Sequence, residues 1–134
     1  MIIGIGTDII EVERVARAIL KEAFKKKIFT EKEIAYCESQ KKDESFAARF
    51  AAKEAFFKAL GTGWRDGMGI TEVEILNDEL GKPSIHLTGK AKEVFEQKGG
   101  THVHLSMSHI KTQAMAYVII ENNTPHPTLS EGEG

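Results

Sequence analysis

The chain has 134 residues, of which 41% are hydrophobic and 28% charged, and its formal net charge is −2. This length and composition fit a single globular domain with a sizeable core, and the charge gives no reason to expect a nucleic-acid partner. No apolar run approaches the roughly 18 residues of a membrane span. Because Cys37 is the only cysteine and the N-terminus lacks a signal-peptide pattern, we expect a protein of the reducing cytoplasm.

The first segment, IIGIGTDII at residues 2–10, alternates in the manner of a β-strand. One of its faces carries Gly4, Gly6 and Asp8, so another backbone or a ligand can come close there. Two roles are open for Asp8. Its carboxylate can cap the helix that follows, or it can face the space that the glycines leave, and the two roles are compatible.

A helical period begins at Glu11 and predicts a helix with an apolar stripe and a basic stripe on opposite faces. The predicted apolar stripe consists of Val12, Val15, Ala16, Ile19, Leu20 and Ala23. The basic stripe consists of Arg14, Arg17, Lys21 and Lys25. A solvated face normally mixes signs, whereas this one is purely positive in a protein that is otherwise acidic. We therefore interpret it as a docking surface for an acidic protein, since no aromatic platform for nucleic acid accompanies it.

The remaining patterns predict three further helices and four strands. A capping box, Thr30 to Glu33, starts the second helix, and the third runs from about residue 43 or 45 to Leu60. Strands are expected at 71–76 and 84–87 around a turn, and at 103–108 and 113–120 as a hairpin; a short helix spans roughly 89–98. The prediction is one α+β domain over residues 1–121, an antiparallel sheet packed with helices, followed by a disordered tail at 122–134.

The third helix carries charges among phenylalanines, in the stretch RFAAKEAFFKALGTG at 49–63. Phe46, Phe50 and Phe57 share one predicted aromatic stripe of this helix. Glu54 lies at the edge of that stripe, and Lys58 follows one turn later. A simple i,i+4 pair is one explanation, but a partly desolvated carboxylate favours a stronger cation. Together with Asp8 it suits Mg²⁺, which takes one or two carboxylates along with waters and phosphates. The histidines are too scattered for a zinc site.

Two further features point to phosphate. In SMSHIK at 106–111, His109 ends a strand beside Ser106, Ser108 and Lys111, which favours a ligand contact although a lone histidine is often structural. After the third helix, the exit from Gly61 to Gly63 can present backbone N–H groups to phosphate oxygens. Neither a P-loop nor a dinucleotide-binding fingerprint is present.

Five motifs taken together resemble the holo-acyl-carrier-protein synthases, the short bacterial-type 4′-phosphopantetheinyl transferases. They are GIGTDIIEVERV (4–15), IFTEKE (28–33), RFAAKEAFFKALGTG (49–63), GKP (81–83) and SMSHIKTQAMAYVI (106–119). The resemblance covers about residues 2–120 in the family's order, and only the tail departs from it. It implies transfer of phosphopantetheine from coenzyme A to a serine of apo acyl carrier protein, releasing adenosine 3′,5′-bisphosphate, in support of fatty acid biosynthesis.

The resemblance also implies roles for individual residues. Asp8 and Glu54 would hold Mg²⁺ on the pyrophosphate of coenzyme A, and Lys58 would contact the same group. His109 would meet a phosphate or help remove the serine proton, with a water relayed to a carboxylate as the alternative base. Arg49 and the exit from Gly61 to Gly63 would help to hold the nucleotide, and Arg14, Arg17, Lys21 and Lys25 would dock the acidic carrier protein.

Family resemblance further implies a homotrimer whose active sites are shared between two subunits. Two other functions fit the same residues. One is a Mg²⁺-dependent hydrolase of phosphoanhydrides, which would consume coenzyme A without a carrier protein. The other is a non-catalytic module that binds an acidic protein.

Overall fold

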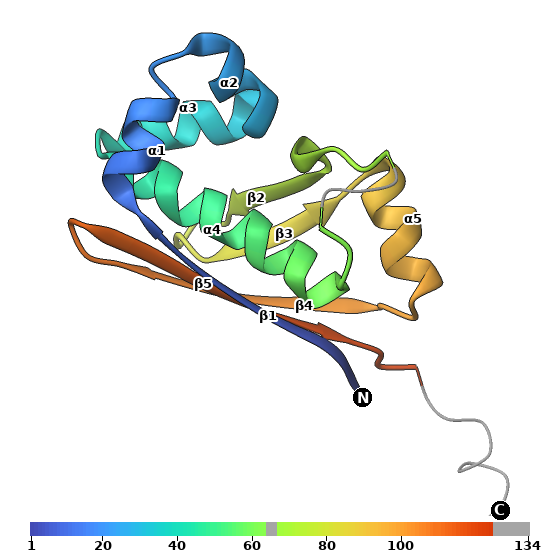
Figure 1. Ribbon diagram of the computed structural model, residues 1–134. Coiled ribbons are helices and arrows are strands. Elements are labelled where there is room, and N and C mark those ends of the chain that lie inside the picture. Colours follow the sequence, from blue (N-terminus) through green and yellow to red (C-terminus); the bar gives the residue numbers. More distant parts are fainter. Residues whose placement is uncertain (64–66, 125–134) are drawn as a thin grey trace, which may run out of the picture.

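In the computed structural model, which describes residues 1–63 and 67–124, a three-stranded antiparallel sheet is covered on one side by helices (Figure 1). The sheet has the order β1-β5-β4, from β1 (Ile2–Glu11), β5 (Gln113–Glu121) and β4 (His102–His109). A separate two-stranded antiparallel sheet pairs β2 (Val73–Asn77) with β3 (Pro83–Leu87). The predicted α+β class with an antiparallel sheet is confirmed.

Helix α4 (Asp43–Leu60) is the central element and lies across the inner face of the sheet (Figure 1). It begins after Lys42 and ends at Gly61, whose left-handed φ of 83° stops the helix as the sequence predicts. Its aromatic side chains form the middle of the core, where Phe56 packs on Phe57 and on Phe95 of α5 (Gly89–Gln97). Phe56 is completely buried although it lies outside the predicted aromatic stripe.

The contact between β1 and α4 is close because glycines of the strand meet alanines of the helix. A Cβ atom at Gly4 would lie 2.0 Å from the carbonyl oxygen of Ala59, and one at Gly6 would lie 2.0 Å from that of Ala55. The space that the glycines leave is therefore filled by the backbone of α4. This contact fixes the end of β1, where Asp8 lies, against the last two turns of the helix.

The predicted helix from Glu11 is two helices, α1 (Val12–Ala18) and α2 (Glu22–Ile28). They are separated by a turn at residues 19–21. In this turn the amides of Leu20 and Lys21 donate to the carbonyls three residues before them, those of Arg17 and Ala18. The turn allows Ile28 and Phe29 to enter the core, and it turns Leu20 outward, so that this side chain is 83% exposed. The prediction of one straight helix with Leu20 and Ala23 in its buried stripe was wrong.

Helix α3 (Glu31–Gln40) begins with the predicted capping box, in which Thr30 Oγ1 accepts from the Glu33 amide and the Glu33 carboxylate accepts from the Thr30 amide. A short 3₁₀ helix, Ile70–Glu72, leads into β2. Beyond β5, Asn122 and Asn123 still hydrogen bond to Met1 and Thr101. Most of the predicted tail, residues 125–134, lies outside the described residues. Among those described, no helix is long and apolar enough to cross a membrane.

Candidate active site

The central contact of the site joins the end of β1 to the last turn of α4. Lys58 Nζ donates to Asp8 Oδ1 at 2.9 Å and to the Thr7 carbonyl at 3.1 Å. The side chain of Lys58 is 59% exposed, whereas that of Asp8 is only 15% exposed. Helix α1 begins after Glu11 without a side-chain cap. Asp8 therefore faces the glycine side and α4 instead of capping the following helix.

A surface pocket of about 560 Å³ opens beside this contact. It is lined by Glu54, Phe57, Lys58, Gly61, Thr62 and Gly63. Glu54 is half-buried. Gly61 and Gly63 have φ angles of 83° and 69°, in the left-handed region that glycine favours, so the chain leaves the helix as an irregular loop with exposed backbone. The pocket thus brings a carboxylate, an ammonium group and a glycine-rich backbone together, as predicted from the spacing.

The donor set fits magnesium in kind. Asp8, which Lys58 contacts, and Glu54, which lines the same pocket as Lys58, both offer carboxylate oxygens, and Mg²⁺ needs one or two carboxylates when phosphate and water oxygens complete its shell. Over residues 1–63 and 67–124, no three His, Cys, Asp or Glu side chains cluster in a way that could hold a metal unaided. A zinc site of protein ligands alone, already disfavoured by the sequence, has no candidate in these ranges.

His109 lies apart from this pocket. It lines a smaller cavity of about 150 Å³ together with Ile9 and Ser108. In the sheet register, Asp8 of the edge strand β1 pairs with Ala116 of β5, while His109 of the opposite edge strand β4 pairs with Ala114. Within one chain, His109 and the pair of Glu54 and Lys58 therefore line separate cavities.

Arg49 is also not among the residues that line the pocket with Lys58. Its side chain is only 4% exposed, stacks on the ring of Tyr36 at 4.4 Å, and donates to the Ser45 carbonyl and to Asn77 Oδ1. Three turns of helix separate Arg49 from Gly61. In the single chain the guanidinium joins α4 to α3 and β2, and its role towards the nucleotide stays a prediction.

The basic stripe is reduced to three cations. Arg14, Arg17 and Lys21 line a surface pocket of about 500 Å³ with Phe24 at its base. Lys25 is removed from this set because the turn after α1 rotates α2, and its ammonium pairs with Glu38 at 2.6 Å over the ring of Phe46. The docking role expected of Lys25 stays a prediction, and in the single chain its ammonium is paired with Glu38, whereas the other three cations line one surface pocket.

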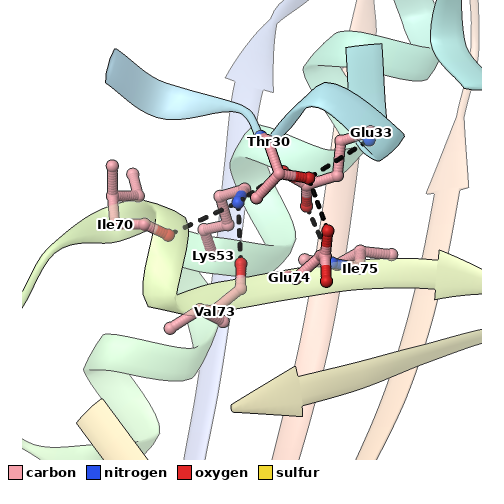
Figure 2. A network of polar contacts seen from close by, with 7 residues as sticks. All are labelled: Thr30, Glu33, Lys53, Ile70, Val73, Glu74 and Ile75. Carbon is pink, nitrogen blue, oxygen red and sulfur yellow. Dashed lines mark hydrogen bonds and ion pairs between the residues drawn. The ribbon is translucent and has the colours of Figure 1, made fainter. Parts of the chain in front are cut away.

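The sequence reasoning missed a buried ion pair that includes Lys53, the residue directly before Glu54. Lys53 and Glu33 are both 0% exposed, and their Nζ and Oε1 atoms lie 2.8 Å apart (Figure 2). Lys53 also donates to the Val73 carbonyl at 2.7 Å, and Glu33 Oε2 accepts from the Ile75 amide at 2.7 Å. Burial lowers the pKa of Lys53, and the Glu33 carboxylate opposes that effect.

Comparison with known proteins places this site in a family. Residues 4–118 match the 4′-phosphopantetheinyl transferase superfamily. The chain therefore belongs to that superfamily, and the resemblance seen in the sequence is confirmed.

The similar proteins share one name. The holo-[acyl-carrier-protein] synthase of Ruminiclostridium cellulolyticum is 51% identical over 120 residues, covering 87% of this chain and 90% of that protein. The protein of the same name from Clostridium tetani is 51% identical, with 90% and 97% coverage.

Solved structures of holo-[acyl-carrier-protein] synthases have the same fold as this chain. The holo-[acyl-carrier-protein] synthase of Neisseria meningitidis superposes with a TM-score of 0.80 at 39% identity, covering 90% of this chain and 99% of that one. The Bacillus anthracis protein, described in complex with CoA (3′,5′-ADP), gives a TM-score of 0.75 at 37% identity, with 92% and 99% coverage.

Proposed function

We propose that this chain transfers the 4′-phosphopantetheine arm of coenzyme A to a serine of apo acyl carrier protein. The observation that carries the proposal is the contact of Lys58 with Asp8 beside a pocket lined by Glu54 and two glycines, in a member of this superfamily. In the reaction, the serine Oγ forms a bond to the β-phosphorus of coenzyme A. The serine proton passes to a base, either His109 or a water relayed to a carboxylate, while the phosphoanhydride bond breaks and adenosine 3′,5′-bisphosphate leaves with its electron pair.

The residues of the site suit that step. The Lys58 ammonium is held by the Thr7 carbonyl and Asp8, so it can place a positive charge against phosphate oxygens without reorganising. Asp8 and Glu54 would hold Mg²⁺, which when bound neutralises charge on the pyrophosphate. The exit from Gly61 to Gly63 offers backbone to the same oxygens, and the candidate metal ligands, Lys58 and the glycines keep the roles expected from the sequence.

The carrier protein would dock on the surface of Arg14, Arg17 and Lys21. Its acidic helices would meet three cations around Phe24, with the exposed Leu20 close by in sequence as an apolar contact. A surface of this kind mainly raises the association rate with the carrier protein and the specificity for it, and contributes less to the binding affinity.

We further propose that the chain acts as a homotrimer with sites shared between subunits. Two observations support this. The outer face of the three-stranded sheet carries exposed apolar side chains, among them Ile5 at 63%, Ile9 at 61% and Tyr117 at 51%, with no described element over them (Figure 1). His109 lines a cavity separate from that of Glu54 and Lys58, and a site completed by His109 of a second subunit would bring these groups together.

Intact mass of an apo acyl carrier protein tests the proposal directly. After incubation with this protein, coenzyme A and Mg²⁺, the carrier should gain one phosphopantetheine arm, and a chelator should prevent the gain. Consumption of coenzyme A without a change in the carrier would support the hydrolase instead. Carrier binding without any covalent change would support a non-catalytic module.

A further inference from the structure

The ion pair of Lys53 and Glu33 meets an open edge of the small sheet. Strand β2 pairs with β3 along one side only, and on its other side the Val73 carbonyl and the Ile75 amide point at α3 and α4. Lys53 donates to the first and Glu33 accepts from the second, as a neighbouring strand would (Figure 2). Buried backbone groups need such partners, so the pair closes the edge.

Every polar atom of the pair is used. Lys53 Nζ donates to Glu33 Oε1, to the Val73 carbonyl and, at 3.4 Å, to the Ile70 carbonyl, which accounts for its three protons. Glu33 also accepts from the Thr30 amide at 2.8 Å. Thr30 in turn donates through Oγ1 to Glu74 of β2 at 2.6 Å. The bonds thus tie α3, α4 and β2 together in fixed directions.

One turn before Lys53, Arg49 also makes a directional contact, with Asn77 of β2, whereas the apolar contacts of α4 hold it less specifically. Towards the sheet, the alanines of α4 face the glycines of β1. This contact sets the distance between helix and strand, but it includes no long side chain that would oppose a rotation of the helix. Its phenylalanines pack in the core, where apolar contacts tolerate small rotations better than directional hydrogen bonds do. Lys53 is the buried directional contact nearest to Glu54, and together with Arg49 it defines the rotation of α4 about its axis.

That rotation decides where the next residues point. Glu54 follows Lys53 directly, about 100° further around the helix, and Lys58 lies one turn beyond Glu54. Lys58 donates to Asp8 at 2.9 Å from a flexible side chain, so the rotation of α4 sets where that side chain starts and which positions its ammonium can reach. We propose that Lys53, held by Glu33, is a positioning residue that aims Glu54 and Lys58 at the reacting phosphates. This role rests on the proposed function.

The test uses the double variant Glu33→Gln/Lys53→Met in the full chain, which removes both charges at nearly constant volume and leaves no buried charge unpaired. The control is Ile28→Ala, which removes buried apolar volume in α2 outside the pair and the pocket. Urea unfolding establishes that both variants are folded at the assay temperature. If the double variant does not fold, Glu33→Asp alone replaces it, because aspartate keeps the buried negative charge beside Lys53 while shortening the side chain that reaches the Ile75 amide.

We expect the double variant to lose at least tenfold in kcat and to bind coenzyme A at least fivefold more weakly by calorimetry, while KM for the carrier protein stays within twofold. The control variant should stay within twofold of the parent in kcat, in affinity for coenzyme A and in KM for the carrier protein. A double variant with unchanged kcat and unchanged coenzyme A affinity would overturn the proposal. So would its crystal structure with Lys58 still at 2.9 Å from Asp8, whether or not any transfer occurs. A parent chain that transfers nothing would refute the proposed function alone, because the crystal structure still decides the positioning role.

Discussion

Replacing Gly6 by alanine should damage both the fold and the site, because the added carbon has no place to go. A Cβ atom there would lie 2.0 Å from the Ala55 carbonyl oxygen and 2.6 Å from the Ala59 amide nitrogen. Contacts below 3.0 Å are essentially never tolerated, so β1 and α4 must separate by at least 3.0 − 2.0 = 1.0 Å. Overpacking of this kind costs about 1–3 kcal/mol.

The same separation reaches the active site, because Asp8 is two residues further along the same face of β1. Adding about 1 Å to the present 2.9 Å between Lys58 and Asp8 gives about 3.9 Å, beyond hydrogen-bond length. We therefore expect Gly6→Ala to lower the free energy of unfolding by about 2 kcal/mol in urea titrations. The transfer rate should fall at least tenfold at a temperature where the variant is folded.

Two controls make this prediction specific. Thr7→Ala changes the opposite, exposed face of β1 and should alter the stability by less than about 0.5 kcal/mol. Adding Ala55→Gly to Gly6→Ala should bring no recovery, since the obstructing atom is a backbone oxygen that both residues carry. A Gly6→Ala protein with parental stability and parental turnover would refute the close packing of β1 on α4 as the basis of the site.

Four other variants test separate parts of the molecule. Glu54→Gln should abolish transfer with the circular dichroism spectrum unchanged, and full turnover would remove Glu54 from the metal site. Arg14→Glu should raise KM for the carrier protein much more than KM for coenzyme A, most strongly at low salt, whereas Lys32→Glu on exposed α3 should not. Burial raises the pKa of Cys37 from 9.0 to about 12, so the native state holds this proton more tightly than the unfolded chain and stability falls as pH rises above about 9. At pH 10 the loss is about 1.4 kcal/mol, and urea titrations at pH 8 and 10 should show it in the parent and not in Cys37→Ala. Arg49→Lys should cost about 1–3 kcal/mol, because an ammonium cannot keep both hydrogen bonds and the stacking on Tyr36; a weaker affinity for coenzyme A as well would assign Arg49 to the nucleotide.

Most elements were predictable from local patterns. The capping box at Thr30, the glycine stop at Gly61 and the alternation of β1 are written in a few neighbouring residues, and each element forms where those residues predict it. The break at residues 19–21 was not predictable in this way. It depends on where Ile28 and Phe29 find space in the core, and nothing in the helical period of α1 reports that space.

The site was predictable to the extent that it depends on one helix and one strand. Glu54, Lys58 and Gly61 follow from spacing along α4, and Asp8 from its place on the glycine face of β1. The positions of Lys25, Arg49 and His109 depend on partners far away in sequence, namely Glu38, Asn77 and the opposite edge of the sheet. Charge patterns along a single element cannot distinguish a solvent-facing cation from one that a distant side chain has captured.

The burial of Lys53 could have been predicted from the sequence. Phe46, Phe50 and Phe57 are spaced so that position 53 completes their apolar stripe. A lysine in such a stripe must be buried, and a buried ammonium group requires an anion. The capping-box residue Glu33 is that anion, and no local pattern could show this because Glu33 belongs to another helix.

The three charged residues among the phenylalanines of α4 therefore have three different surroundings. Lys53 contacts the edge of β2, Glu54 lines the pocket, and Lys58 contacts Asp8.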